Sequence, residues 1–300
     1  MDMKVNIAGV EWKNPVTVAS GTFGSGEEFS EFVDLNRLGA VTTKGVANGP
    51  WPGNPTPRVA EVYGGMMNAI GLQNPGIDLF CKRDIPFLKK YDTKIIVNVC
   101  GHAPEEYLAV VERLADEPID MMEINISCPN VNAGFLAFGQ DAKHVEELTA
   151  QIKKIAKQPI IMKLTPNVTD ITEIAKAAEA GGADALSLIN TLTGMKIDIN
   201  RRTFAVANKT GGVSGPVVHP IAVRMVYQTA QAVNIPIIGM GGIATPEDAI
   251  EMILAGASAV SVGTANFYNP NATIEIIDGI EAYMKKNGFE SVKDMVGIVK

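Results

Sequence analysis

Cysteine is scarce in this chain. Only Cys81, Cys100 and Cys128 occur among 300 residues, and no two of them have CxxC spacing. Three cysteines are too few for a disulfide framework, and their spacing excludes the usual cysteine clusters for zinc or iron–sulfur centres. We therefore expect no metal site in this chain and a reducing, cytoplasmic location.

Long hydrophobic runs and clusters of one charge are also missing. No window approaches about 18 uninterrupted apolar residues, the length that spans a membrane, and the N-terminus lacks the pattern of a secretion signal. The net charge is −7 and there is no Lys/Arg-rich run. We therefore expect neither a nucleic-acid partner nor a membrane surface.

Two common nucleotide-binding signatures are absent as well. No GxGxxG follows the first strand and no GxxxxGK[ST] occurs, so neither a Rossmann dinucleotide site nor a P-loop is expected.

The chain does contain a repeating unit, in which an apolar run precedes a polar loop and an amphipathic segment. The predicted strands are residues 16–20, 40–46, 94–100, 121–127, 159–164, 185–190, 236–242 and 259–265. The predicted helices are residues 27–38, 77–90, 104–117, 141–157, 169–180, 217–233, 246–255 and 274–286. Uninterrupted apolar strands that alternate with helices are typical of a parallel sheet covered by helices.

At this length the pattern favours a closed (β/α)8 TIM barrel over an open doubly wound sheet. We predict a single α/β domain over residues 1–300. A short β-hairpin, residues 4–7 and 10–12, precedes the barrel, and long loops cover its C-terminal mouth. The longest of these, residues 48–76, is predicted to form part of a wall over the mouth.

Active sites of such barrels lie at the carboxyl ends of the strands. These ends carry two lysines and several amides, more polar chemistry than a scaffold needs: Lys44, Lys163, Asn98, Asn125 and Asn190. The last two strands end in glycines, at Gly241-Gly242 and Gly263. Glycine backbone that opens toward a helix predicts a phosphate cradle.

Several motifs, taken together and in order, resemble dihydroorotate dehydrogenase. They are ASGTFG at 19–24, TTKGV at 42–46, NAIGLQNPG at 68–76, VNVCG at 97–101, EINISCPNV at 123–131, IMKLTPNVTDI at 161–171, INTLTGM at 189–195 and GGVSGP at 211–216. The cysteine within ISCPN matches the loop residue of class 1 enzymes of this family. The following segment, NAGFLAFGQD, resembles the corresponding loop of the class 1B catalytic subunit.

The resemblance implies FMN at the barrel mouth and oxidation of (S)-dihydroorotate to orotate in pyrimidine (UMP) synthesis. Cys128 matches the family's base, Lys163 the lysine beside the flavin ring, and Lys44 a lysine between flavin and substrate. The residues that match FMN contacts are Ser20, Lys44, Gly45, Asn98, Asn125, Lys163, Ile189, Gly215, Gly241, Gly242, Gly263 and Thr264. Those that match substrate contacts are Lys44, Asn68, Ala69, Ile70, Gly71, Leu72, Asn125, Asn190 and Thr191.

The chain has no cysteine cluster for iron–sulfur chemistry and no nicotinamide-binding fingerprint, so electrons from a class 1B enzyme must leave through another protein. The resemblance to class 1B implies a partner subunit that carries FAD and a [2Fe–2S] cluster and reduces NAD⁺, in a heterotetramer built on a homodimer of this chain. A class 1A homodimer that reduces fumarate remains an alternative. From other classes, a lyase or aldolase with a Schiff base on Lys163 or Lys44, and a non-catalytic partner-binding barrel, also remain open.

Overall fold

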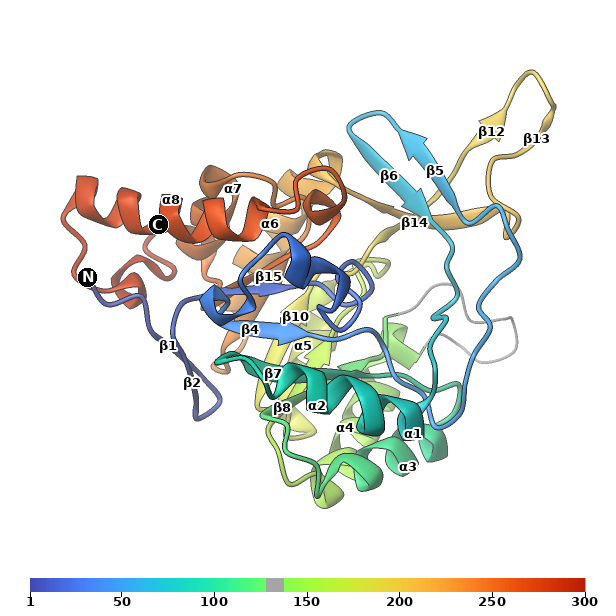
Figure 1. Ribbon diagram of the computed structural model, residues 1–300, viewed down its shortest axis with the longest axis horizontal. Coiled ribbons are helices and arrows are strands. Elements are labelled where there is room, and N and C mark those ends of the chain that lie inside the picture. Colours follow the sequence, from blue (N-terminus) through green and yellow to red (C-terminus); the bar gives the residue numbers. More distant parts are fainter. Residues whose placement is uncertain (128–137, 300) are drawn as a thin grey trace.

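The computed structural model describes residues 1–127 and 138–299. Eight parallel strands lie side by side in the order β3-β16-β15-β10-β9-β8-β7-β4, and helices surround them (Figure 1). The strands are β3 (Val16–Val18), β4 (Ala40–Thr42), β7 (Lys94–Val99), β8 (Met121–Asn125), β9 (Ile160–Lys163), β10 (Ala185–Leu188), β15 (Ile237–Met240) and β16 (Ala259–Val262). The first and last strands in this order meet where the hydroxyls of Thr17 and Thr42 share a 3.2 Å hydrogen bond. The predicted (β/α)8 barrel is confirmed.

The strands are shorter than the apolar runs that predicted them. Each run contains one strand, but the strand ends one to four residues before the run does. The remaining residues leave the hydrogen-bonded ladder, and many of them line the mouth of the barrel.

The predicted N-terminal hairpin is present as β1 (Val5–Ile7) and β2 (Val10–Trp12). Its turn residues Ala8 and Gly9 both have positive φ, 52° and 88°, the conformation that matches the twist of a two-residue hairpin. Trp12 is fully buried in the main hydrophobic core. The hairpin lies at the side of the molecule away from β5 and β6 (Figure 1).

Six longer helices alternate with the strands from β7 onward. They are α3 (Pro104–Leu114), α4 (Ala142–Ile155), α5 (Ile171–Ala180), α6 (His219–Ala230), α7 (Pro246–Ala255) and α8 (Ala272–Asn287). Two begin at side-chain caps, since the Asp170 side chain accepts from Thr172 N–H and Thr245 forms a capping box with Asp248. Each of these helices buries its apolar stripe against the sheet.

Two of the predicted helices are wrong in detail. Residues 27–38 form only two 3₁₀ turns, η1 (Glu28–Glu31) and η2 (Leu35–Arg37). Asp34, in extended conformation, accepts from Asn36 N–H and starts a new turn, so one continuous helix cannot form. Residues 77–90 form α1 (Ile77–Leu79) and α2 (Ile85–Leu88) around a π-helical segment, η3 (Phe80–Asp84). Pro86, which has no N–H donor, lies two residues after this segment, in the first turn of α2.

A second, antiparallel sheet stands over the mouth in the order β11-β14-β6-β5. Its strands are β5 (Val59–Val62), β6 (Gly65–Asn68), β11 (Leu192–Met195) and β14 (Thr210–Ser214). A further hairpin, β12 (Ile197–Asp198) and β13 (Thr203–Phe204), projects beyond it (Figure 1). The wall predicted from residues 48–76 is therefore only half of the observed one, because β11 and β14 complete it.

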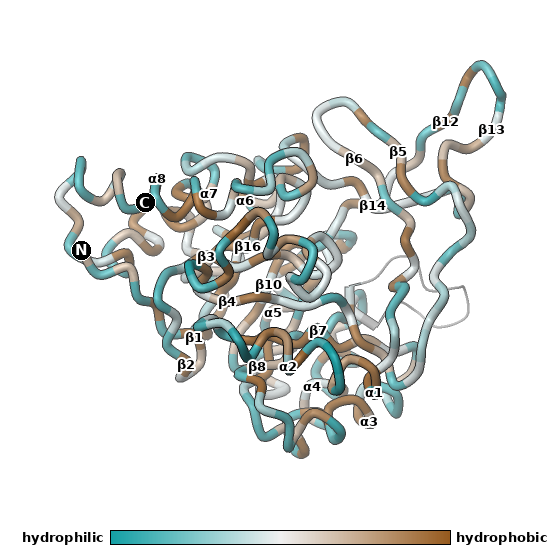
Figure 2. Tube along the Cα trace, in the orientation of Figure 1, coloured by the Kyte–Doolittle hydropathy of each residue, from teal (hydrophilic) through white to brown (hydrophobic). Residues whose placement is uncertain are grey.

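Hydropathy follows this arrangement. Hydrophobic residues concentrate along the barrel strands, whereas the tip of the β12–β13 hairpin is mostly hydrophilic (Figure 2). In the part of the chain that the structure describes, no helix is long and apolar enough to cross a membrane.

Candidate active site

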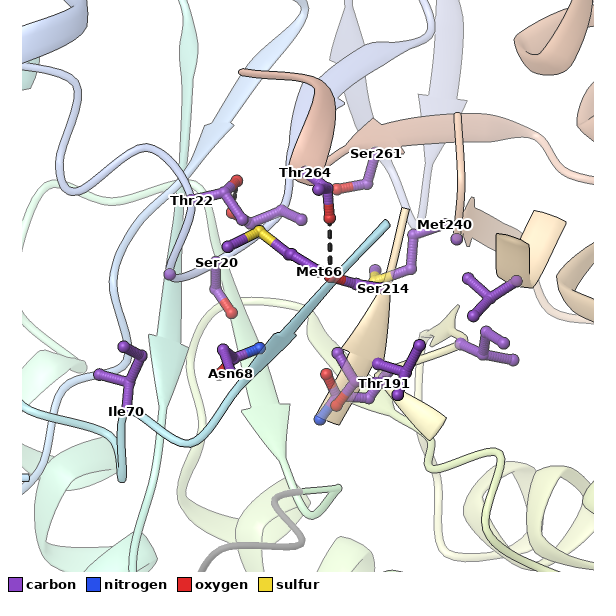
Figure 3. Close-up of a pocket in the computed structure, with 18 of the residues that line it drawn as sticks. Ser20, Thr22, Met66, Asn68, Ile70, Thr191, Ser214, Met240, Ser261 and Thr264 are labelled. Carbon is purple, nitrogen blue, oxygen red and sulfur yellow. Dashed lines mark hydrogen bonds between the residues drawn. The ribbon is translucent and has the colours of Figure 1, made fainter. Parts of the chain in front are cut away.

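A cavity that is open to solvent on one side lies between the barrel mouth and the second sheet. It is lined from the strand ends of the barrel, from β6 and β14, and from the loop after β6. Figure 3 shows Ser20, Asn68, Thr191, Ser214 and Thr264 gathered around this one space although they come from distant parts of the chain.

Most of the residues predicted for the site line this cavity. They are Ser20, Lys44, Gly45, Asn68, Ile70, Gly71, Leu72, Asn125, Lys163, Ile189, Asn190, Thr191, Gly241, Gly242, Gly263 and Thr264. The barrel fold therefore brings predicted cofactor and predicted substrate residues together. Their individual roles stay predictions.

Four predicted residues stand apart. Asn98 is fully buried and lies behind the lining, where its amide bonds Glu123. Ala69 is buried beside Met67 and Val206, in a small cluster behind the β6 strand. Gly215 sits directly behind the glycine turn, where its carbonyl approaches Gly242. Cys128 lies outside the described residues.

The glycine turn after β15 leaves no room for side chains. Gly241 and Gly242 have φ of 126° and 70°. A Cβ on Gly242 would lie 2.7 Å from His219 Cβ and 2.8 Å from the Gly215 carbonyl oxygen. Bare backbone thus lines the cavity beside the start of α6, the arrangement that favours an anion.

His219 holds this turn from behind. Its Nδ1 lies 2.9 Å from the Gly241 carbonyl oxygen and its Nε2 lies 3.2 Å from the Glu251 carboxylate. On the neighbouring strand end, the hydroxyl of Thr264 donates to Ser214 at 2.8 Å (Figure 3). The turn after β15 is thereby tied to α6 and α7, and the turn after β16 to the second sheet.

Lys163 brings a buried positive charge to the cavity. Its side chain is 3% exposed and its Nζ donates to Ser20 Oγ at 3.1 Å. The Glu123 carboxylate lies 3.8 Å from the same Nζ. Glu123 also accepts from Asn98 Nδ2 at 2.6 Å and from Ser187 Oγ at 2.8 Å. Glu123 lies within the predicted strand 121–127, and no role was predicted for it.

The end of β8 is fixed by amides immediately before Cys128. Asn125 Oδ1 accepts from both the backbone N–H and the hydroxyl of Ser127, at 3.2 and 2.8 Å. Asn190 Nδ2 donates to the carbonyl oxygen and to the hydroxyl of Ser127, each at 2.9 Å. Two residues predicted to bind substrate therefore also hold the strand end.

The second sheet positions the remaining polar groups. Asn68 Nδ2 approaches the Gly212 carbonyl oxygen at 3.5 Å. Asn167 Nδ2 donates to the Thr191 carbonyl oxygen at 3.1 Å, and its Oδ1 accepts from Thr193 N–H at 2.9 Å. Asn167 thus fixes the segment after β10, and nothing in the sequence beyond its place in KLTPNV pointed to it.

The other lining residues, for which no role was predicted, are mostly apolar or small. They are Ala19, Gly21, Thr22, Val59, Met66, Val213, Ser214, Val218, Met240, Ser261 and Phe267. Several lie inside the motifs already quoted, such as GGVSGP, so adjacency to a motif was the only available signal.

Cys81, one of the remaining cysteines, has an unreactive environment. It is buried, and the pKa of its thiol is raised to about 11, mainly by burial and to a smaller extent by the nearby Glu117 carboxylate. Since the thiolate is the reactive form, Cys81 is poorly suited to chemistry near neutral pH. In residues 1–127 and 138–299, no group of three His, Cys, Asp or Glu side chains is placed to hold a metal ion.

Comparison with known proteins covers nearly the whole chain. The family model described as dihydroorotate dehydrogenase matches residues 2–284. A protein of Lachnoclostridium phytofermentans, named dihydroorotate dehydrogenase B (NAD(+)), catalytic subunit, is 69% identical over 300 residues, all of this chain and all of that protein. Proteins of the same name from Alkaliphilus metalliredigens and Alkaliphilus oremlandii are each 63% identical, over 99% of this chain and 98% of theirs.

Proposed function

This chain belongs to the dihydroorotate dehydrogenase family, and we propose that it is the catalytic subunit of a class 1B, NAD⁺-linked enzyme. It oxidises (S)-dihydroorotate to orotate in pyrimidine synthesis. The observation that carries the proposal is one cavity in which a glycine turn, a buried lysine and several amides converge. We further propose a cytoplasmic location, in keeping with the use of cysteine in the sequence.

The lining fits FMN. Gly241, Gly242, Gly263 and Thr264 offer backbone to a phosphate, at a turn where a side chain on Gly242 would collide with its surroundings. Lys163 supplies a buried ammonium for the flavin ring, and Ser20, Gly45 and Ile189 line the remaining surface. Asn98 and Gly215 support this lining from behind. When bound, FMN would accept a hydride from carbon 6 of dihydroorotate and take negative charge onto its ring.

The residues of the chain account for the other half of the reaction. Cys128 Sγ takes the proton from carbon 5, so that the electron pair left there forms the double bond to carbon 6 as the hydride departs. Lys44 draws the anionic substrate into the cavity. Asn68, Asn125, Asn190 and Thr191 hold its ring and carboxylate, because amides offer both donors and acceptors to a cyclic imide. Residues 69–72, which follow Asn68, cover the substrate on the side of the second sheet.

Electrons leave through another protein. The names of the relatives include "catalytic subunit" and NAD(+), which supports a partner. We propose that this partner carries FAD and a [2Fe–2S] cluster and that a homodimer of this chain forms the core of a heterotetramer. The same names favour NAD⁺ over fumarate as the final acceptor, and family membership argues against a Schiff-base lyase.

The proposal is tested by mixing the purified chain with dihydroorotate under anaerobic conditions. We expect a yellow protein whose flavin absorbance bleaches on mixing. Orotate should appear in an amount equal to the flavin that is reduced. Fumarate added afterwards should not restore the absorbance, whereas NAD⁺ should do so only with the partner present. The proposal is contradicted if the protein stays colourless after FMN is added, or if dihydroorotate does not bleach the absorbance of the bound flavin.

A moderate effect on the rate of flavin reduction is expected for Ser127→Ala. The change removes the hydroxyl that joins Asn125 to Asn190, so the strand end before Cys128 is less well placed. We expect flavin reduction to slow about tenfold, equivalent to a loss of roughly 1.4 kcal/mol, with flavin content unchanged. Stopped-flow absorbance measures the rate.

The matched control for this change is Ser30→Ala, whose hydroxyl donates only to the exposed Glu27 carbonyl. It should reduce flavin at the wild-type rate. An unchanged rate in Ser127→Ala itself would show that the amide pair does not position the base.

A further inference from the structure

We propose that Glu123 is a positioning residue that acts through the charge of Lys163, and that this buried carboxylate sets the redox potential of the bound flavin. The inference rests on the proposed function, because it assumes FMN beside Lys163. It assigns a role to a residue that neither lines the cavity nor belongs to the predicted site.

The first support is burial. The side chains of Glu123 and Lys163 are each 3% exposed, and among the described residues no other ion pair has both partners so deeply buried. Moving two charges out of water is costly, and a buried pair is often no more stable than a well-packed apolar pair. Stability alone therefore does not explain why the barrel interior contains this pair.

The second support is the way the carboxylate is held. Asn98 donates to one oxygen at 2.6 Å and Ser187 to the other at 2.8 Å. These neutral donors come from β7 and β10, on opposite sides of β8 and β9. Glu123 is thus kept at 3.8 Å from Lys163 Nζ instead of closing into a short salt bridge.

The consequence concerns the donors of the ammonium. A lysine has three N–H donors, and Ser20 accepts one of them at 3.1 Å. Because the Glu123 carboxylate lies 3.8 Å from Nζ, beyond hydrogen-bond distance, it does not take up a donor of the ammonium. The ammonium also lines the cavity. Glu123 balances the charge while leaving Lys163 able to face a ligand.

The third support is depth. Asn125 and Lys163 are paired across β8 and β9 and both line the cavity. Glu123 lies two residues earlier on the same face of β8, one layer deeper, and it is not part of the lining. It therefore influences a ligand by its charge through a medium of low dielectric constant, in which such effects are strong.

Charge arithmetic gives the expected signs. Glu123→Gln keeps the shape and removes one negative charge, so the site gains positive charge and the midpoint potential of the bound flavin should rise. Lys163→Met removes the positive charge, so the potential should fall. The double variant removes both charges, and its potential should return close to wild type.

The experiment is a redox titration of the flavin in all four proteins at pH 6. Each single change is expected to alter the ratio of reduced to oxidised flavin at least tenfold at a fixed applied potential, about 30 mV for a two-electron couple. The control is Glu147→Gln, because Glu147 also lies 3.8 Å from a lysine, Lys143, but both side chains are exposed. It should leave the potential unchanged.

Thermal unfolding of the flavin-free proteins provides a second measurement that does not depend on the cofactor. Each single variant leaves one buried charge unpaired and should be less stable, whereas the double variant should regain stability. If a single variant fails to fold and the double variant folds, the coupling is still demonstrated.

The proposal is overturned if Glu123→Gln leaves the potential unchanged or lowers it, or if the double variant lies outside the range of the two single variants. Absence of any bound flavin in the wild type would instead contradict the proposed function, and the unfolding comparison would still test the charge pair.

Discussion

Replacement of Cys128 by alanine is expected to slow the reduction of bound flavin by dihydroorotate roughly 100- to 10,000-fold, the usual contribution of a general base. The hydride cannot leave carbon 6 efficiently unless the proton on carbon 5 is removed. Flavin content should not change, since the predicted FMN contacts lie on other residues. Anaerobic stopped-flow absorbance gives the rate directly.

The rate of flavin reduction in the wild type should also depend on pH in the way that a thiol base requires. The base must be a thiolate, and an unperturbed thiol has a pKa of about 8.5. The rate should therefore increase as the pH rises toward that value and then level off.

Cys81→Ala serves as the control for this experiment. Burial raises the pKa of the Cys81 thiol to about 11, so this thiol carries little negative charge in the working range. Its removal should leave both the rate and the pH profile intact. A Cys128→Ala enzyme that keeps its rate, or a rate that falls as the pH rises from 6 to 8, would rule out this base.

Replacement of Gly242 by alanine is expected to abolish retention of FMN during purification. The residue has a φ of 70°, and an added Cβ would lie 2.7 Å from His219 Cβ and 2.8 Å from the Gly215 carbonyl oxygen. Left-handed backbone costs a side chain about 1–2 kcal/mol, and the contacts force the turn to move. Since each 1.4 kcal/mol is tenfold in affinity, we expect binding of FMN to weaken more than about tenfold, measured by fluorescence titration.

Gly9→Ala is the matched control for the glycine turn. Gly9 has a φ of 88°, but nothing lies within 4 Å of an added Cβ. It reproduces the backbone strain at the distal hairpin without the collision. This variant should bind FMN as the wild type does, and equal loss of flavin in both variants would mean that general instability, not the turn, is responsible.

The sequence by itself determined the barrel. Runs such as residues 121–127 and 185–190 each predicted a strand, because a parallel strand covered on both faces is apolar throughout. Thr245 and Asp170 cap helices through bonds to residues two or three positions ahead, contacts that depend on neighbouring residues alone. The motifs around NISCPN and NAIGLQNPG carried the family, and the eight quoted motifs together contain most of the residues that line the cavity.

Only the tertiary structure decided how distant residues combine. The second sheet could not be predicted from TLTGM and TGGVSG, because β11 and β14 have few apolar residues and are formed by pairing with each other and with β6. Residues 27–38 have a helical pattern that a single side-chain bond at Asp34 overrides. Asn98, predicted to contact FMN, donates its side-chain amide to Glu123, a contact that nothing local in the sequence indicated.

The buried pair Glu123–Lys163 illustrates the limit most clearly. An acid in one apolar run and a lysine in another are each visible in the sequence, but nothing local indicates that they face the same interior at 3.8 Å. Strand pairing and the register of the barrel set that distance. Periodicity and capping depend on neighbouring residues, whereas charge pairing depends on separation in space, which only the closed barrel establishes.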